Sequence, residues 1–273
     1  MRIIITGGTG LIGTALAYAL SLRDAEVIVL SRDPIAAAQR FHRLGLPRVE
    51  TIGWDAQTAG GWGQLLSGAC AIVNLAGASP AHWRWTRAYR QRMLDSRLRA
   101  GAAIMEAMQR YGPPRALVQA SAAGYYGHRG DEVLTERSEP GQGFRADVCQ
   151  AWEASILRAE TRTCILRTGM VLDAHAGAFP ALRRFAELGG SRFGTGRQWM
   201  PWIHGRDVAS AICFLLDQPS LSGAFNLCAP HLVTNEEYLR QLRRAQKRPA
   251  ALPLSALALR ALLGELSTAV LDS

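Results

Sequence analysis

A short β-branched run at the start of the chain leads directly into a glycine-rich turn, RIIITGGTGLIG. Gly7, Gly10 and Gly13 have the spacing of a dinucleotide-binding fingerprint. One glycine makes the tight turn, one lets the backbone approach a pyrophosphate, and one lets helix and strand pack closely. The following helix would offer unpaired N–H groups to the phosphates. The predicted cofactor contacts of this turn are Gly7, Gly10, Leu11, Ile12 and Gly13.

Strands and helices alternate through most of the chain, and several strands are continuous apolar runs, which is typical of a parallel sheet covered on both faces. The predicted strands are 2–6, 26–30, 49–54, 69–77, 115–121, 163–169 and 223–228. One predicted helix follows the glycine-rich turn and ends near residue 22. The other predicted helices span 84–111, 144–160, 205–217, 234–246 and 253–264. From about residue 175, Gly, Pro and Trp become frequent. We therefore predict an α/β fold, a doubly wound parallel sheet of the Rossmann type (1–173 and 205–228) with a smaller C-terminal substrate lobe (174–204 and 229–273).

Composition narrows the functional classes. No apolar run reaches the length of about twenty residues that a membrane helix needs, and the N-terminus lacks a signal-peptide pattern. The net charge of +9 comes from scattered arginines, which disfavours a nucleic-acid partner. The five cysteines and six histidines show no metal-ligand spacing, and we expect mostly buried, reduced thiols. We predict a cytoplasmic monomer or homodimer that acts on a small molecule, without metal, membrane or nucleic acid.

The end of the second strand selects the cofactor. An acidic residue there would bind a ribose 2′-OH and repel a 2′-phosphate. This chain instead has VLSRDP, with Ser31 and Arg32 at the strand tip and Asp33 already in the turn. A hydroxyl and a guanidinium suit a phosphate. We predict NADP (NADPH) over NAD; the alternative is that Arg32 is only a solvated surface residue.

The motifs TGGTGLIG, NLAG, SAAGYYG, LRTGMVL and WIHGRD follow one another in an order that resembles the extended short-chain dehydrogenase/reductases. WTRAYRQRMLDSR, VCQAWE and GTGRQWMPWIH are most similar to an atypical branch, the epimerase-like family of SDR39U1-type proteins. The resemblance covers nearly the whole chain. The family's usual C-terminus extends further, so we expect the last part of the small lobe to be missing.

The resemblance also implies further cofactor contacts. Leu75, Ala76 and Gly77, the turn after the fourth strand, would line the adenosine side. Val171, just past the sixth strand, would lie near the nicotinamide. Arg97, in the long helix, would contact the cofactor. The alternative for Arg97 is that it belongs to a solvated arginine face with its neighbours.

Typical members of the superfamily use a Tyr-x-x-x-Lys pair, in which the lysine favours the tyrosinate and holds the ribose. The pair cannot exist here, because Lys247 is the only lysine and no tyrosine lies between 127 and 237. If helix 144–160 is the one that normally carries the pair, Arg145 stands at the Tyr position and Cys149 at the Lys position. A guanidinium does not shuttle protons at neutral pH.

Three side chains are candidate substitutes for the pair. Ser121 and Tyr125 lie at the end of the fifth strand, and Tyr126 is the alternative to Tyr125. Cys149 would need a lowered pKa; simple packing is the alternative for Cys149. The candidate substrate contacts are Arg197, Trp202 and His204. We predict an NADP(H)-dependent oxidoreductase or nucleotide-sugar-epimerase-like enzyme of unknown substrate. The alternative is a catalytically degenerate NADPH-binding sensor or interaction protein.

Overall fold

The computed structural model describes residues 1–82, 84–248, 253–263 and 266–271. Its centre is a seven-stranded parallel sheet in the order β10-β6-β5-β4-β1-β2-β3, which confirms the predicted doubly wound fold. The strands are β1 (Arg2–Thr6), β2 (Glu26–Ser31), β3 (Glu50–Gly53), β4 (Ala71–Asn74), β5 (Ala116–Ala122), β6 (Arg162–Thr168) and β10 (Gly223–Leu227). All seven predicted strands are present, although β4 is shorter than the predicted 69–77.

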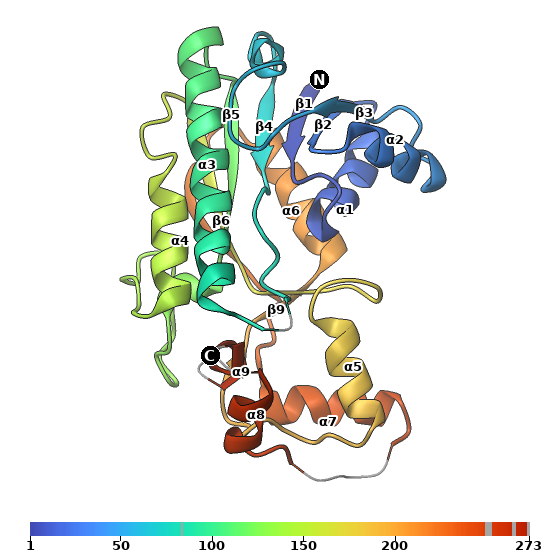
Figure 1. Cartoon of the computed structure of the whole chain (residues 1–273), viewed down its shortest axis with the longest axis vertical. Coiled ribbons are helices and arrows are strands. Elements are labelled where there is room, and N and C mark those ends of the chain that lie inside the picture. The colour runs from blue at the N-terminus through green and yellow to red at the C-terminus, as the bar shows by residue number, and fades with distance from the viewer. Residues whose placement is uncertain (83, 249–252, 264–265, 272–273) are drawn as a thin grey trace.

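Helices cover both faces of the sheet. Successive strand residues point to opposite faces, and here both faces are apolar and need to be buried. Ile3 and Ile5 pack into one core with α1 (Leu11–Ser21) and α6 (Gly205–Asp217). Ile4, between them, packs into a second core with α3 (Arg87–Tyr111) and the 3-10 turn η1 (Gly63–Leu66). Helix α4 (Phe144–Ala154) lies beside α3 (Figure 1). None of the described helices is both long and apolar enough to cross a membrane.

The structure corrects two expectations about helices. Helix α4 ends at Ala154 rather than near 160; the Ser155 hydroxyl donates to the Trp152 carbonyl there and competes with helix continuation. Three α-helices were not predicted: α2 (Pro34–Arg43), α5 (Phe179–Glu187) and α9 (Leu266–Leu271). The signal for α2 was present, since Asp33 caps it and proline occupies its first position, but SRDP has the composition of a turn.

A smaller group of elements lies beyond the carboxyl ends of the strands (Figure 1). It contains α5, α7 (Asn235–Ala245), α8 (Ala256–Leu263), α9 (Leu266–Leu271) and the antiparallel pair β8 (Trp199–Met200) and β11 (Val233–Thr234). Its own core includes Phe193, Tyr238, Leu239 and Leu259. Residues 249–252, 264–265 and 272–273 of the predicted lobe lie outside the described residues. The predicted domain boundaries stay a prediction.

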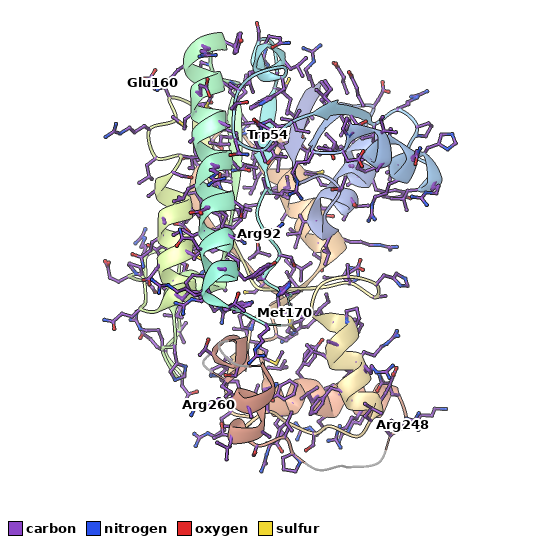
Figure 2. All side chains as sticks on the ribbon, viewed as in Figure 1. Trp54, Arg92, Glu160, Met170, Arg248 and Arg260 are labelled. Carbon is purple, nitrogen blue, oxygen red and sulfur yellow. The ribbon has the colours of Figure 1, made fainter. Side chains whose placement is uncertain are left out.

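Two short parallel strands join the sheet to this small lobe. They are β7 (Met170–Leu172) and β9 (Trp202–His204), and Val171 is paired with Ile203. Met170 marks this junction in Figure 2. The carboxyl edge of the sheet therefore faces β7, β9 and the lobe, and parallel α/β sheets bind their ligands at this edge.

Candidate functional site

The glycine-rich turn after β1 is closed tightly against its neighbours. Gly7 has φ of +67°, and a Cβ atom added to it would lie 2.6 Å from the Leu75 carbonyl oxygen. A Cβ on Gly13 would lie 2.5 Å from the Cα of Gly8. Helix α1 begins after Gly10 with no side-chain cap and no acidic residue in its first turn. Its first amides therefore remain open to an anion.

A buried chain of hydrogen bonds fixes the strand ends beside this turn. The Thr6 hydroxyl donates to Asn74 Oδ1 (2.6 Å), and the Asn74 amide donates to Gln119 Oε1 (2.9 Å). Asn74 Oδ1 also accepts the Ala76 N–H at 3.3 Å. All three polar side chains are fully buried, so breaking one bond would leave its partner unsatisfied. The chain holds the turn after β4 against Gly7.

The tip of β2 presents a guanidinium rather than a free carboxylate. The Ser31 hydroxyl bonds the Asp33 backbone, and Asp33 Oδ1 accepts the Ala36 N–H (2.9 Å) as the cap of α2. Asp33 is thus engaged in helix capping. Arg32 is exposed, and its side chain has no hydrogen bond or ion pair to any residue that the structure describes.

Arg97 is buried, so the alternative of a solvated arginine is wrong for this residue. Its Nη1 donates to the carbonyls of Ala78 (3.2 Å) and Met93 (2.8 Å), and its guanidinium lies 4.6 Å from the Trp152 ring centre. Neither Arg97 Nε nor Trp152 Nε1 has a hydrogen-bond partner in the described part of the chain. Burial lowers the pKa of Arg97. A Cβ on Gly77 would lie 3.0 Å from the guanidinium carbon, which places this buried charge under the Gly77 turn.

Two predicted cofactor residues from distant segments come together at the start of α1. A Cβ on Gly177 would lie 3.1 Å from Leu11 Cδ1. A Cβ on Gly205 would lie 3.6 Å from Leu11 Cδ2 and 3.8 Å from Val171 Cγ1. Leu11 and Val171 therefore form one apolar wall where β7 approaches the phosphate turn.

A buried ion pair between α4 and β6, beside the end of β5, was not revealed by the sequence pattern. Arg167 donates to both oxygens of Glu153, Nε to Oε1 at 3.0 Å and Nη2 to Oε2 at 2.9 Å. Glu153 Oε1 also accepts the Ser121 hydroxyl at 2.6 Å. Glu153 lies one helical turn beyond Cys149, on the face of α4 that faces β5, and this i, i+4 spacing was the available signal.

The two neighbouring tyrosines differ in their surroundings. Both belong to the 3-10 turn η2 (Ala123–Tyr126). Tyr126 is buried, and its hydroxyl donates to Asn226 Oδ1 (2.6 Å) and accepts from Arg167 Nη1 (3.1 Å). Tyr125 is half-buried, its ring lies 3.4 Å from the Arg167 guanidinium carbon, and its hydroxyl has no partner among the described residues. Of the pair, Tyr125 therefore offers the available hydroxyl.

Cys149 faces the end of β5 from α4 and is buried. Burial raises the pKa of its thiol, and the charges of Arg145 and Arg97 oppose this effect only in part. A raised pKa disfavours the thiolate that nucleophilic chemistry needs. Among the other thiols, Cys228 is exposed, unlike the buried thiols expected from the sequence.

We expect native protein treated with iodoacetamide near neutral pH to be alkylated at Cys228 well before Cys149, because Cys149 is buried and Cys228 is exposed. Burial raises the pKa of both thiols, so access rather than protonation separates their rates. Peptide mass spectrometry over time measures both rates. Cys228→Ser is the control that removes the fast-labelling site. Equal labelling rates at the two cysteines would show that Cys149 is an activated thiol.

Two of the three predicted substrate contacts, Trp202 and His204, lie on β9 at the junction, and Arg197 precedes β8 in the lobe. Trp202 Nε1 donates to the His231 carbonyl (3.2 Å), and His204 Nδ1 accepts the Arg206 N–H (3.2 Å) as the cap of α6. His204 and Arg197 are both exposed. Within the described ranges, no three His, Cys, Asp or Glu side chains group as metal ligands would.

Known proteins resemble this chain over most of its length. The family described as "NAD dependent epimerase/dehydratase family" matches residues 3–228. An epimerase family protein of Mycobacterium leprae is 36% identical over 267 residues, covering 96% of this chain and 83% of that protein. The crystal structure of human epimerase family protein SDR39U1 (isoform 2) with NADPH gives a TM-score of 0.85 at 30% identity, covering 100% of this chain and 89% of that one.

A more distant structure has the same fold. The UDP-glucose 4-epimerase of Thermus thermophilus, in complex with NAD, gives a TM-score of 0.73 at 23% identity and covers 93% of this chain and 87% of that one. The structural neighbours thus include one that holds NADPH and one that holds NAD.

Proposed function

Because this chain belongs to the NAD dependent epimerase/dehydratase family, we propose that it binds NADPH and is an oxidoreductase or a nucleotide-sugar-epimerase-like enzyme without the usual Tyr-x-x-x-Lys pair. The observation that carries the proposal is the glycine turn. A Cβ atom added to Gly7 or Gly13 would collide with neighbouring backbone atoms. The turn leads directly into α1, whose first amides have no side-chain cap. Such a cradle fits a pyrophosphate.

The chain's own residues fit the rest of a dinucleotide. The Gly7–Gly13 turn would hold the pyrophosphate, and the buried cation of Arg97 under Gly77 would gain an anion that it lacks within the described part of the protein. Leu75 and Ala76 would line the adenosine side. Leu11 and Val171 would form the apolar wall of the nicotinamide side. When bound, the nicotinamide supplies or accepts a hydride.

We further propose that Ser31 and Arg32 select NADPH over NADH. The Arg32 guanidinium has no partner among the residues described and is exposed at the strand tip, where a 2′-phosphate would lie. The presence of NADPH in the human relative supports this choice.

We expect Arg32→Glu to weaken NADPH binding by about tenfold to a hundredfold while NADH binding changes little, because the substitution replaces attraction to the 2′-phosphate with repulsion. Titration of tryptophan fluorescence with each cofactor measures the two affinities. Arg40→Glu makes the same charge change on an exposed residue further along α2 and is the matched control. Equal binding of both cofactors by the unmodified protein would contradict the selection by Ser31 and Arg32, and absence of both would contradict the proposed function.

The acid/base group would come from the end of β5 or from α4. Tyr125 is the strongest candidate because its hydroxyl has no partner in the described structure, whereas Ser121 is held by Glu153 and Cys149 is enclosed and protonated. The substrate would lie between the nicotinamide and β9, within reach of Trp202 and His204, and Arg197 would bind an anionic group. We propose a cytoplasmic monomer or homodimer, with residues 174–204 and 229–273 as the substrate lobe.

A second candidate function is an NADPH-binding sensor or interaction protein without turnover. The absence of both members of the catalytic pair from the sequence favours it. Incubation with NADPH and a panel of carbonyl compounds and nucleotide sugars separates the candidates. Consumption of NADPH, or conversion of a nucleotide sugar, supports the enzyme.

A further inference from the structure

The chain between Gly127 and Gly141 forms an Ω loop, a compact surface loop whose two ends meet. The Gly141 N–H donates to the Tyr125 carbonyl (2.9 Å), and a Cβ atom added to Gly141 would overlap the Tyr126 carbonyl oxygen. The loop therefore leaves and rejoins the fold at one point, beside the turn that carries Tyr125. Its residues 128–140 are all described and contain no helix or strand. Long loops of this kind in compact domains are often functional.

The middle of the Ω loop is anchored to the carboxyl ends of two strands of the sheet. The Glu136 carbonyl accepts from Arg167 Nη1 on β6 (3.1 Å), and Glu136 Oε1 accepts the Asn226 N–H of β10 (2.9 Å). A brace inside the loop stiffens it further, because Arg129 donates to both carboxylate oxygens of Glu132, Nε at 2.8 Å and Nη2 at 2.7 Å. The loop thus lies as a stiff unit over the carboxyl ends of β6 and β10, beyond which the chain enters the small lobe.

The facing part of the lobe, the turn of residues 193–200, is also fixed. Asn235 is fully buried; its Oδ1 accepts the Phe193 N–H (2.8 Å) at the start of the turn, and its Nδ2 donates to Met200 Sδ (3.3 Å) at the end. The first two N–H groups of α7 donate to carbonyls of the same turn, each at 2.9 Å. Helix α7 therefore holds the turn, and Trp199 on it, in one position.

A hydrogen bond that is exposed to solvent joins these two stiff parts. Trp199 Nε1 donates to Asp131 Oδ1 at 2.8 Å, and both residues are exposed. Water competes for exposed polar groups, so a bond of this kind shifts an equilibrium by about tenfold or less. The bond can break and re-form without disturbing either part, because the loop and the turn each keep their own anchors.

We propose that the Asp131–Trp199 bond is the clasp of a lid. When the bond is made, the Ω loop closes the space between the carboxyl edge of the sheet and the lobe; when it breaks, the tip of the loop moves away and admits a small molecule. The lid lies between two segments proposed for the reaction, since the loop begins beside Tyr125 and Trp199 lies three residues before Trp202. The inference rests on the proposed function for its substrate, whereas the clasp itself needs no cofactor.

A reporter thiol beside the loop measures how often the lid opens. Tyr125→Cys places it next to Arg167, to which the loop is bonded, and Cys228→Ser removes the exposed native thiol. In this background, peptide mass spectrometry follows the labelling of residue 125 by a bulky maleimide dye. Asp131→Ala and Trp199→Phe should each raise the labelling rate about fivefold to tenfold. The two together should raise it no further, since both remove the same bond.

Two matched variants separate the clasp from a general loosening of the loop. Glu139→Ala removes another exposed carboxylate of the same loop, whose side chain has no partner among the described residues, and should leave the rate unchanged. Asp131→Asn keeps an acceptor oxygen for the indole and should stay within about twofold of the parent rate. Equal rates in all variants, or additive increases from Asp131→Ala and Trp199→Phe, overturn the proposal.

Limited proteolysis of the chain with its native Tyr125 gives a second measurement that does not depend on the reporter. Trypsin cleaves inside the loop after Arg129 or Arg137, and Trp199→Phe leaves the sequence around both sites unchanged. Cleavage should become about fivefold faster in Trp199→Phe, and an unchanged rate overturns the proposal. NADPH binding is measured separately in the unmodified protein. Its absence would contradict the proposed function, whereas the labelling and cleavage rates test only the clasp.

Discussion

NADPH affinity is expected to fall by about hundredfold or more when Gly7 is replaced by alanine. The added Cβ would lie 2.6 Å from the Leu75 carbonyl oxygen and 2.7 Å from its carbon, and these backbone atoms cannot rotate away. The φ of +67° adds a further penalty for a residue with a Cβ. The turn must therefore move away from β4, and the pyrophosphate cradle opens.

The matched control for this substitution is Gly45→Ala. Gly45 has a similar φ of +75°, but an added Cβ there meets nothing within 4 Å in the described structure. Both variants should lose about 1 to 2 kcal/mol of unfolding free energy from the backbone conformation, whereas only Gly7→Ala should lose NADPH. Fluorescence titration and urea unfolding measure the two effects. Unchanged affinity in Gly7→Ala would mean that the turn does not carry the cofactor.

Arg167→Met should lower the free energy of unfolding by about 3 to 5 kcal/mol, because it leaves the Glu153 carboxylate buried without its cation. Burial alone would lower the pKa of Arg167, but its hydrogen bonds to Glu153 and Tyr126 outweigh burial and raise that pKa. A cation with a raised pKa stabilises the fold below that pKa. The ionisation of Arg167 therefore adds no pH dependence of its own to this loss in the neutral range.

Urea unfolding at several pH values measures this loss. Arg183→Met is the control, since it breaks an exposed i, i+4 pair with Glu187 that is worth about 0.5 kcal/mol or less. The double variant Glu153→Leu with Arg167→Met leaves no buried charge and should recover most of the stability that Arg167→Met loses. A loss in Arg167→Met no larger than the control would contradict a strong dependence of the fold on this pair.

The sheet could be predicted because its strands are short and continuously apolar, with turn signals at their ends. All seven were found, and the motifs along them identified the family. Helix α5 was missed because its sequence, FPALRRFAE, is only nine residues long, carries a proline at its second position and is followed closely by the glycine-rich run 189–196. Helix α2 was missed because the segment that caps it, SRDP with Asp33, also has the composition of a turn.

The candidate site divides in the same way. The glycine turn was predictable since its spacing alone implies a local geometry. The role of Glu153 was not, because the carboxylate acquires its partners from β5 and β6, which are brought to α4 only by the fold. Arg97 was singled out by family resemblance, and only the structure shows that it is buried, with an Nε that no described residue accepts from.

The two halves of the candidate site differ in the groups that form them, which are main chain in one half and side chains in the other. The proposed pyrophosphate cradle consists of main chain, since its glycines have no side chains and its proposed donors are the amides of α1. The other half consists of side chains on Ser121, Tyr125, Glu153 and Arg167. Side-chain substitutions in the second half are therefore expected to leave the backbone of the first half in place. One scaffold can therefore exchange its reaction while it keeps its coenzyme, and the loss of a familiar catalytic pair says little about whether the coenzyme still binds.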